Sequence, residues 1–177
     1  MLKPIAALAA FALAGCTTPT AENTAGGNDA VESIAFSTGP CFGACPVFEI
    51  EVDRSGKGIY RGKRFVAEKG ERAFTASAAE WNAFTERLAL FRPEASEKYG
   101  FENCDGPTAT DQATVVVTWR DAEGGKTTLD WYMGCRQPGL AENAERIYGA
   151  WQELPLDDLV GTIEDRFRYE QDQTAGG

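Results

Sequence analysis

The sequence predicts an α+β fold, a mainly antiparallel sheet of about five or six strands with two helices packed on one face. Three observations favour this class. Strand-like and helix-like segments follow one another twice along the chain, strands first each time. Apolar residues recur at every second position in the former and every third or fourth in the latter. Two turn-rich links of hairpin length, 54–58 and 121–125, join strand-like segments directly.

The first half of the chain is predicted to form four strands, because apolar and polar residues alternate there or β-formers dominate: 31–37, 47–53, 59–66 and 70–75. A helix follows, since Ser77 and Glu80 have the spacing of a capping box. Its apolar positions share one face, which we expect to pack into the core rather than to form an aromatic binding stripe: Trp81, Phe84, Leu88 and Phe91.

Residues 92–111 are predicted to form a long irregular connection, and long connections in small domains are often functional. A hairpin of strands 112–119 and 126–133 comes next. A second helix is expected after Pro138, with one apolar face: Leu140, Ala144, Ile147, Trp151 and Leu154. Residues 156–168 are consistent with a short further helix.

The N-terminus predicts export and lipid attachment. Lys3 precedes an apolar run at 5–13, which is too short to span a bilayer but suits a signal peptide. The run ends in Leu13-Ala14-Gly15-Cys16, which resembles the lipobox of bacterial lipoproteins. That resemblance implies cleavage before Cys16 and a diacylglycerol on its sulfur, and several acyl chains anchor a protein stably. The alternative is an ordinary signal peptide with a chance cysteine.

Four regions are therefore expected: a signal peptide at 1–15, a flexible lipid tether at 16–30, one domain at 31–168 and a frayed polar tail at 169–177. Thr17 stands where an aspartate would resemble the inner-membrane retention signal. We therefore expect a location in the cell envelope, on the outer membrane and facing the periplasm. The membrane contact would be made through the lipid on Cys16.

Four further cysteines, an even number in an oxidising compartment, predict two disulfides among three possible pairings. We favour Cys41–Cys45, which closes a small loop, and Cys104–Cys135, which encloses the predicted hairpin. A four-cysteine zinc site and a redox-active C-x3-C pair are the alternatives, although neither the zinc-knuckle nor the thioredoxin spacing is present.

Charge and composition exclude several classes of function. Of 17 Lys and Arg, Lys3 alone precedes Cys16, which leaves 16 in the mature chain against 27 Asp and Glu. Such an acidic chain repels phosphate backbones, so we expect no nucleic-acid partner. The chain has no histidine, which rules out triads that use one and removes the commonest general base. Neither a calcium-loop pattern nor a Gly-rich phosphate cradle occurs, so we expect no metal or cofactor.

The segment C-F-G-A-C-P-V-F at 41–48, followed by Gly56 and by Tyr60 and Gly62 at hairpin spacing, resembles the bacterial domain-of-unknown-function family 6438. Thr110-Asp111 before a later strand matches a further feature of that family. The resemblance runs loosely over 31–154 and implies an exported, often lipidated α/β domain with no established activity. Some relatives keep only the first two cysteines, which supports pairing Cys41 with Cys45.

The leading functional hypothesis is a non-catalytic, envelope-tethered binding module with an envelope protein or small ligand as partner. Its possible binding surface comprises two carboxylates of the irregular connection and three aromatics of the second hairpin: Asp105, Asp111, Trp119, Trp131 and Tyr132. We favour turn or cap roles for the carboxylates and core or cross-strand packing for the aromatics over a place in such a surface. Glu102 and Asp130 are further carboxylate candidates for acid–base chemistry. The other functional hypotheses are a periplasmic enzyme using carboxylates or a redox cysteine pair, and a structural envelope lipoprotein.

Overall fold

A computed structural model describes residues 31–175. The signal peptide, Cys16 and the tether expected at 16–30 lie outside the described residues. The strands and helices follow in this order: β1 Val31–Thr38, β2 Val47–Asp53, β3 Lys57–Arg64, β4 Gly70–Thr75, α1 Ala78–Ala89, β5 Glu97–Tyr99, β6 Thr114–Asp121, β7 Lys126–Tyr132, the 3-10 turn η1 Ala141–Asn143, α2 Ala144–Tyr148, the 3-10 turn η2 Ala150–Glu153, α3 Asp157–Val160 and α4 Arg166–Ala175.

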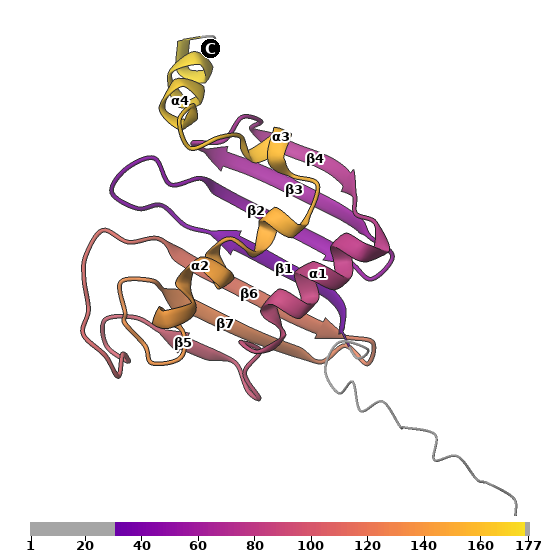
Figure 1. Cartoon of the computed structure of the whole chain (residues 1–177), viewed down its shortest axis with the longest axis vertical. Coiled ribbons are helices and arrows are strands. Elements are labelled where there is room, and N and C mark those ends of the chain that lie inside the picture. The colour runs from indigo at the N-terminus through magenta and orange to yellow at the C-terminus, as the bar shows by residue number, and fades with distance from the viewer. Residues whose placement is uncertain (1–30, 176–177) are drawn as a thin grey trace, which may run out of the picture.

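The seven strands form one sheet in the order β4-β3-β2-β1-β6-β7-β5. All neighbours pair antiparallel except β5, which runs parallel to β7. Helices α1, α2 and α3 all lie over the same side of this sheet (Figure 1). The α+β class is thus confirmed, and no helix within residues 31–175 covers the opposite side of the sheet, here called the uncovered face.

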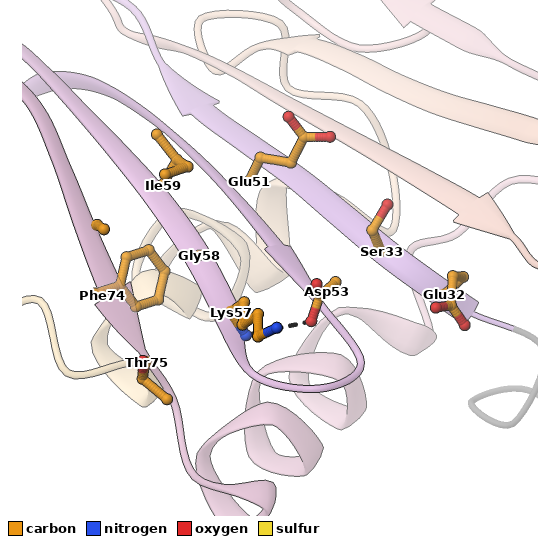
Figure 2. A pocket seen from close by; sticks show the side chains of 10 residues that line it. Glu32, Ser33, Glu51, Asp53, Lys57, Gly58, Ile59, Phe74 and Thr75 are labelled. Atoms are coloured by element: carbon orange, nitrogen blue, oxygen red, sulfur yellow. Dashed lines mark hydrogen bonds between the residues drawn. The ribbon is translucent and has the colours of Figure 1, made fainter.

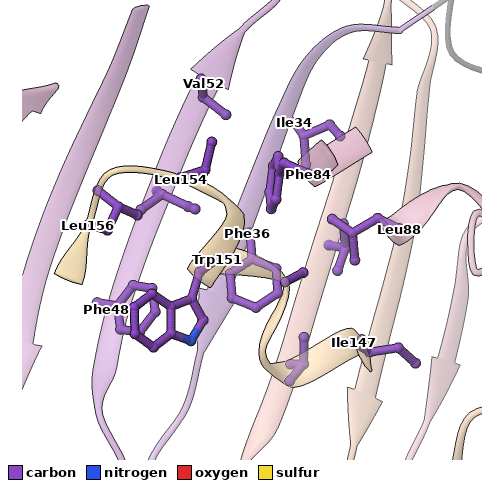
Figure 3. Packing of buried hydrophobic residues seen from close by; sticks show 14 of the residues in the cluster. Ile34, Phe36, Phe48, Val52, Phe84, Leu88, Ile147, Trp151, Leu154 and Leu156 are labelled. Carbon is purple, nitrogen blue, oxygen red and sulfur yellow. The ribbon is translucent and has the colours of Figure 1, made fainter. Parts of the chain in front are cut away.

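The core lies between the sheet and its helices because the strands alternate. In β1, Ile34 and Phe36 are buried whereas Ala35 between them is only partly covered. Phe36 packs against Phe84 of α1, and Phe48 of β2 meets Trp151 edge-on, with ring centroids 6.3 and 5.7 Å apart. Figure 3 shows these aromatic rings with the aliphatic side chains around them. Three segments distant in sequence therefore share one core.

The predicted capping box is present at the start of α1. The backbone N–H of Glu80 donates to the Ser77 hydroxyl at 3.2 Å, and the Ser77 N–H donates to the Glu80 carboxylate at 2.6 Å. This exchange satisfies two amides that the first helical turn leaves unpaired. The predicted apolar face is confirmed as core, since Trp81, Phe84 and Leu88 are buried.

The structure corrects the expected number and length of several elements. A seventh strand, β5, lies inside the stretch predicted to be irregular; three residues are too few for a readable alternation. The predicted second helix is divided into η1, α2 and η2, with Gly149 between the last two. Glycine has no side chain to restrict its backbone and weakens a helix interior by about 1 kcal/mol.

The tail expected to fray from residue 169 instead belongs to α4 as far as residue 175. Contacts with the β3–β4 turn hold it. The Glu170 carboxylate accepts from the Phe65 N–H at 3.2 Å and pairs with Lys69 at 3.2 Å. The ring of Phe167 also meets Phe65 edge-on at 5.9 Å. A polar sequence is therefore ordered here by partners that composition does not reveal.

Candidate functional site

One end of the sheet collects the loops that carry both disulfides, and we call it the disulfide end. Loops 39–46, 100–113 and 133–140 all leave the sheet there, at the left of Figure 1. Disulfides join Cys41 to Cys45 and Cys104 to Cys135, with Cα atoms 5.7 and 5.6 Å apart. The favoured pairing is thus confirmed.

The Cys41–Cys45 ring is held against the sheet by hydrogen bonds on both sides. The Gly39 N–H donates to the Thr114 carbonyl at 2.8 Å, and the Phe42 N–H donates to the Asp111 carbonyl at 3.0 Å. The Thr38 hydroxyl donates to the Pro46 carbonyl at 2.6 Å. Inside this fixed ring the side chain of Phe42 is 87% exposed. A large apolar side chain is therefore presented to solvent on a braced backbone.

The second disulfide, Cys104–Cys135, ties loop 100–113 to the segment that directly follows β7. Cys135 is fully buried, and the Trp131 indole N–H donates to its carbonyl at 2.9 Å. The Arg136 N–H reaches the Pro107 carbonyl at 2.9 Å, and Thr108 forms a bridge with Cys135. Loop 100–113 thus has a defined conformation although it contains little regular structure.

The two predicted carboxylates lie at the disulfide end. Asp105 bonds to Gln137 of loop 133–140, and Asp111 bonds within loop 100–113. The side-chain amide of Gln137 donates to Asp105 at 2.7 Å, and its carbonyl oxygen accepts from the Asp105 N–H at 2.9 Å. The Thr110 hydroxyl donates to Asp111 at 2.9 Å, and Asp111 has a left-handed backbone with φ of 66°. Both side chains therefore help to shape the loops, as turn chemistry predicts.

Trp119 and Trp131 do not belong to a binding surface: each is 1% exposed within the core, which confirms the packing role favoured from the sequence. They occupy alternate strand positions that point toward the helices. Tyr132, one position later, faces the other way. Its hydroxyl donates to the Ala109 carbonyl at 2.9 Å, and the ring of Phe101 packs on it with centroids 4.9 Å apart. Tyr132 therefore remains part of the candidate surface.

Sequence reasoning missed Phe42 and Phe101, the two exposed phenylalanines of the disulfide end. A signal was available for the first, since Phe42 stands within a disulfide ring that spans only four positions. For Phe101, in a stretch without periodicity, the sequence offers no comparable signal.

A second feature, which the sequence does not predict, is a hollow of about 590 Å³ on the uncovered face. Strands β1 to β4 line it, and Figure 2 shows Glu51, Asp53 and Ile59 among its side chains. Asp53 also organises the β2–β3 turn, because one of its carboxylate oxygens accepts from the Ser55 hydroxyl and N–H and from the Lys57 N–H, at 2.6, 2.8 and 3.2 Å.

These hydrogen bonds affect the charge state of Asp53. The Ser55 hydroxyl, followed by the two backbone amides, holds the pKa of Asp53 below its usual value, against the opposing effect of burial. The carboxylate is therefore ionised at neutral pH and adds to the negative charge of the hollow.

Within residues 31–175, no helix is both long and apolar enough to cross a bilayer. Over the same residues, no three carboxylates or cysteines converge in a way that could hold a metal ion. The most exposed large apolar side chain at the disulfide end, Phe42, and the hollow on the uncovered face are the features that stand out for recognition.

Comparison with known proteins gives one match. Residues 32–150 match the family described as Domain of unknown function (DUF6438). No curated protein and no solved structure shows significant similarity to the chain. The match covers more than half of the chain, runs from β1 to the start of η2, and includes both disulfides and the aromatic residues of the disulfide end. The chain therefore belongs to the DUF6438 family.

Proposed function

We propose that this protein is a lipid-anchored component of the cell envelope whose domain binds another envelope protein through the disulfide end, without catalysing a reaction. The anchor is Cys16, preceded by a signal-peptide apolar run and by Leu13-Ala14-Gly15. Thr17 supports an outer-membrane position facing the periplasm, because it stands where an aspartate would resemble the inner-membrane retention signal. Two disulfides suit such an oxidising compartment.

The observation that carries the binding proposal is Phe42, 87% exposed on a ring that is closed by a disulfide and clamped to Asp111. Fully burying a phenylalanine in a partner contributes about 1.5–3 kcal/mol. Because the ring is already fixed, little backbone entropy is lost when it binds, and more of that energy appears as affinity. Aromatic residues held in this way are typical centres of protein interfaces.

A second aromatic pair extends the same surface. Phe101 stacks on Tyr132 at the disulfide end, and the Tyr132 hydroxyl accepts from the Gln112 N–H at 3.3 Å, next to Asp111. Two loops braced by separate disulfides thus present aromatic rings on one side of the domain. This arrangement favours a partner with apolar recesses over a small polar ligand.

Photocrosslinking from the tip of the ring tests the proposal. A benzoyl-phenylalanine placed at position 42 of the full chain in living cells should give a discrete adduct with one envelope protein. The control is the same probe at Glu123, which is exposed in the turn between β6 and β7, at the opposite end of the sheet. A second probe at Phe101 should capture the same partner. Identical adduct patterns from positions 42 and 123 would refute the proposed surface.

The anchor needs its own test. Mass spectrometry of the mature protein should find an N-terminal peptide that begins at Cys16 and carries acyl chains. The Cys16→Ser variant should leave the membrane fraction. Recovery of an intact, unacylated N-terminus from the cytosol would overturn the lipoprotein proposal, whatever the crosslinking shows.

A further inference from the structure

We infer that the hollow on the uncovered face, about 590 Å³ in volume, docks an extended segment of a partner protein that carries Lys or Arg at alternate positions. This surface is separate from the disulfide end and does not depend on the lipid anchor. It lies toward the opposite end of the sheet, because Ser33 near the start of β1 and Asp53 at the end of β2 both line it.

The shape of the hollow follows from the strand register. Ala35, Glu51, Ile59 and Ala73 lie in one row across β1 to β4. Three of the four, Glu51, Ile59 and Ala73, line the hollow, and the short side chain of Ala73 next to the longer Ile59 leaves space on the β4 side. Gly58, Ile59, Ala73 and Phe74 supply the apolar part of the lining. Glu32, Glu51 and Asp53 supply negative charge, and Lys57 lies next to Asp53 (Figure 2).

The charges of this face identify the occupant. In the neighbouring row, Glu71 pairs with Arg61 at 3.0 Å and Glu49 pairs with Lys63. Near the other edge of the sheet, Asp130 of β7 pairs with Lys98 of β5 at 3.1 Å. By contrast, neither Glu51 nor Glu32 forms an ion pair with any residue of the described part of the chain. Among the described residues that line the hollow, Lys57 is the one cation against three carboxylates, Glu32, Glu51 and Asp53, so a partner's Lys or Arg would balance the remaining negative charge.

Spacing selects an extended segment. Glu51 and Asp53 are two positions apart on β2 and point to the same face, about 7 Å apart along the strand. Alternate residues of an extended partner segment have the same separation. A cation at one position reaches Glu51 while its aliphatic stem covers Ile59. The cation two positions on reaches the oxygen of Asp53 that does not serve the β2–β3 turn.

A peptide titration tests this inference on the mature chain carrying Cys16→Ser, which stays in solution. The probe is acetyl-Lys-Thr-Lys-Thr-Lys-amide at low salt, followed by amide NMR shifts. The largest shifts are expected at Glu51, Ile59 and Ala73. Glu51→Gln should weaken binding about fivefold, the effect of losing one exposed ion pair. Glu86→Gln removes the same charge from α1, on the covered side, and should leave the affinity unchanged.

Two further comparisons separate shape from charge. Ala73→Tyr fills part of the hollow without changing the net charge and should weaken binding as much as Glu51→Gln does. A peptide of the same composition with its lysines adjacent should bind more weakly than the alternating probe. Equal effects of Glu51→Gln and Glu86→Gln, or equal binding of the two peptides, would overturn the inference, because either result means that the whole acidic surface attracts cations without a site.

Discussion

Replacing both members of one disulfide by alanine separates the contributions of the two cross-links to stability. In the chain-entropy account, a disulfide stabilises the fold by restricting the unfolded chain, and the effect grows with the loop that it closes. The sequence separations are 31 for Cys104–Cys135 and 4 for Cys41–Cys45. These values correspond to about 3.7 and about 1.9 kcal/mol of unfolding free energy. The longer loop should therefore matter by about 2 kcal/mol more.

Local packing increases this difference. Cys135 is fully buried, so removing its sulfur also leaves a small void in the core, whereas Cys41 and Cys45 are only partly covered. Loss of the Cys104–Cys135 bond additionally frees loop 100–113 from the second hairpin. Loss of the shorter bond leaves the Phe42 backbone hydrogen bond to Asp111 in place.

Urea unfolding followed by tryptophan fluorescence measures both effects. The chain has four tryptophans, and all are at most 5% exposed, so their emission reports loss of the core directly. The double variant Cys104→Ala/Cys135→Ala should unfold at clearly lower urea than Cys41→Ala/Cys45→Ala, with the unmodified chain as reference. If the short-loop variant proves equally or more destabilised, loop length does not determine the contribution of these disulfides.

Three other predictions concern the same fold. Ser77→Ala should lower the unfolding free energy by about 1 kcal/mol in the same urea assay, because it removes the capping bond to Glu80, whereas Ser37→Ala on the uncovered face should change it little. Burial raises the pKa of Tyr60 above its ordinary value of 10.0, so the folded state holds this proton more tightly than the unfolded state. The contribution of Tyr60 to the unfolding free energy should therefore be fully present below pH 10 and fall above it, and Tyr60→Phe should flatten this alkaline decrease. Thiol titration of the unreduced Cys16→Ser protein should find no reactive thiol, and two fast-reacting thiols would instead favour the redox-enzyme hypothesis.

The elements with strong local signals could be predicted from the sequence. Alternation located β1 and β2 closely, β-forming residues located β6 to within two positions, and the Ser77 and Glu80 spacing located the start of α1. The cysteine pairing was also predictable, because Cys41 and Cys45 are only four positions apart and Cys104 and Cys135 lie on either side of a predicted hairpin. Each of these features depends on residues that are near in sequence or on a simple count.

The features that depend on distant contacts could not be predicted. Strand β5 exists through three parallel pairings with β7, and α4 is held by contacts with the β3–β4 turn. For the candidate site, the turn roles of Asp105 and Asp111 were predictable from residue type, whereas the opposite orientations of Trp131 and Tyr132 depend on which strand face meets the helices. The hollow needs four strands in register, so no single segment of sequence encodes it.

Strand β1 has a mechanical consequence. It begins where the expected tether ends and finishes three positions before Cys41, so it connects the proposed anchor to the proposed contact. It lies in the interior of the sheet and is hydrogen-bonded on both sides, to β2 and to β6. A force pulling these two ends apart acts along the strand and loads both ladders in shear. Their bonds must then fail together rather than one at a time, which suits a link that carries tension between a membrane and a second structure.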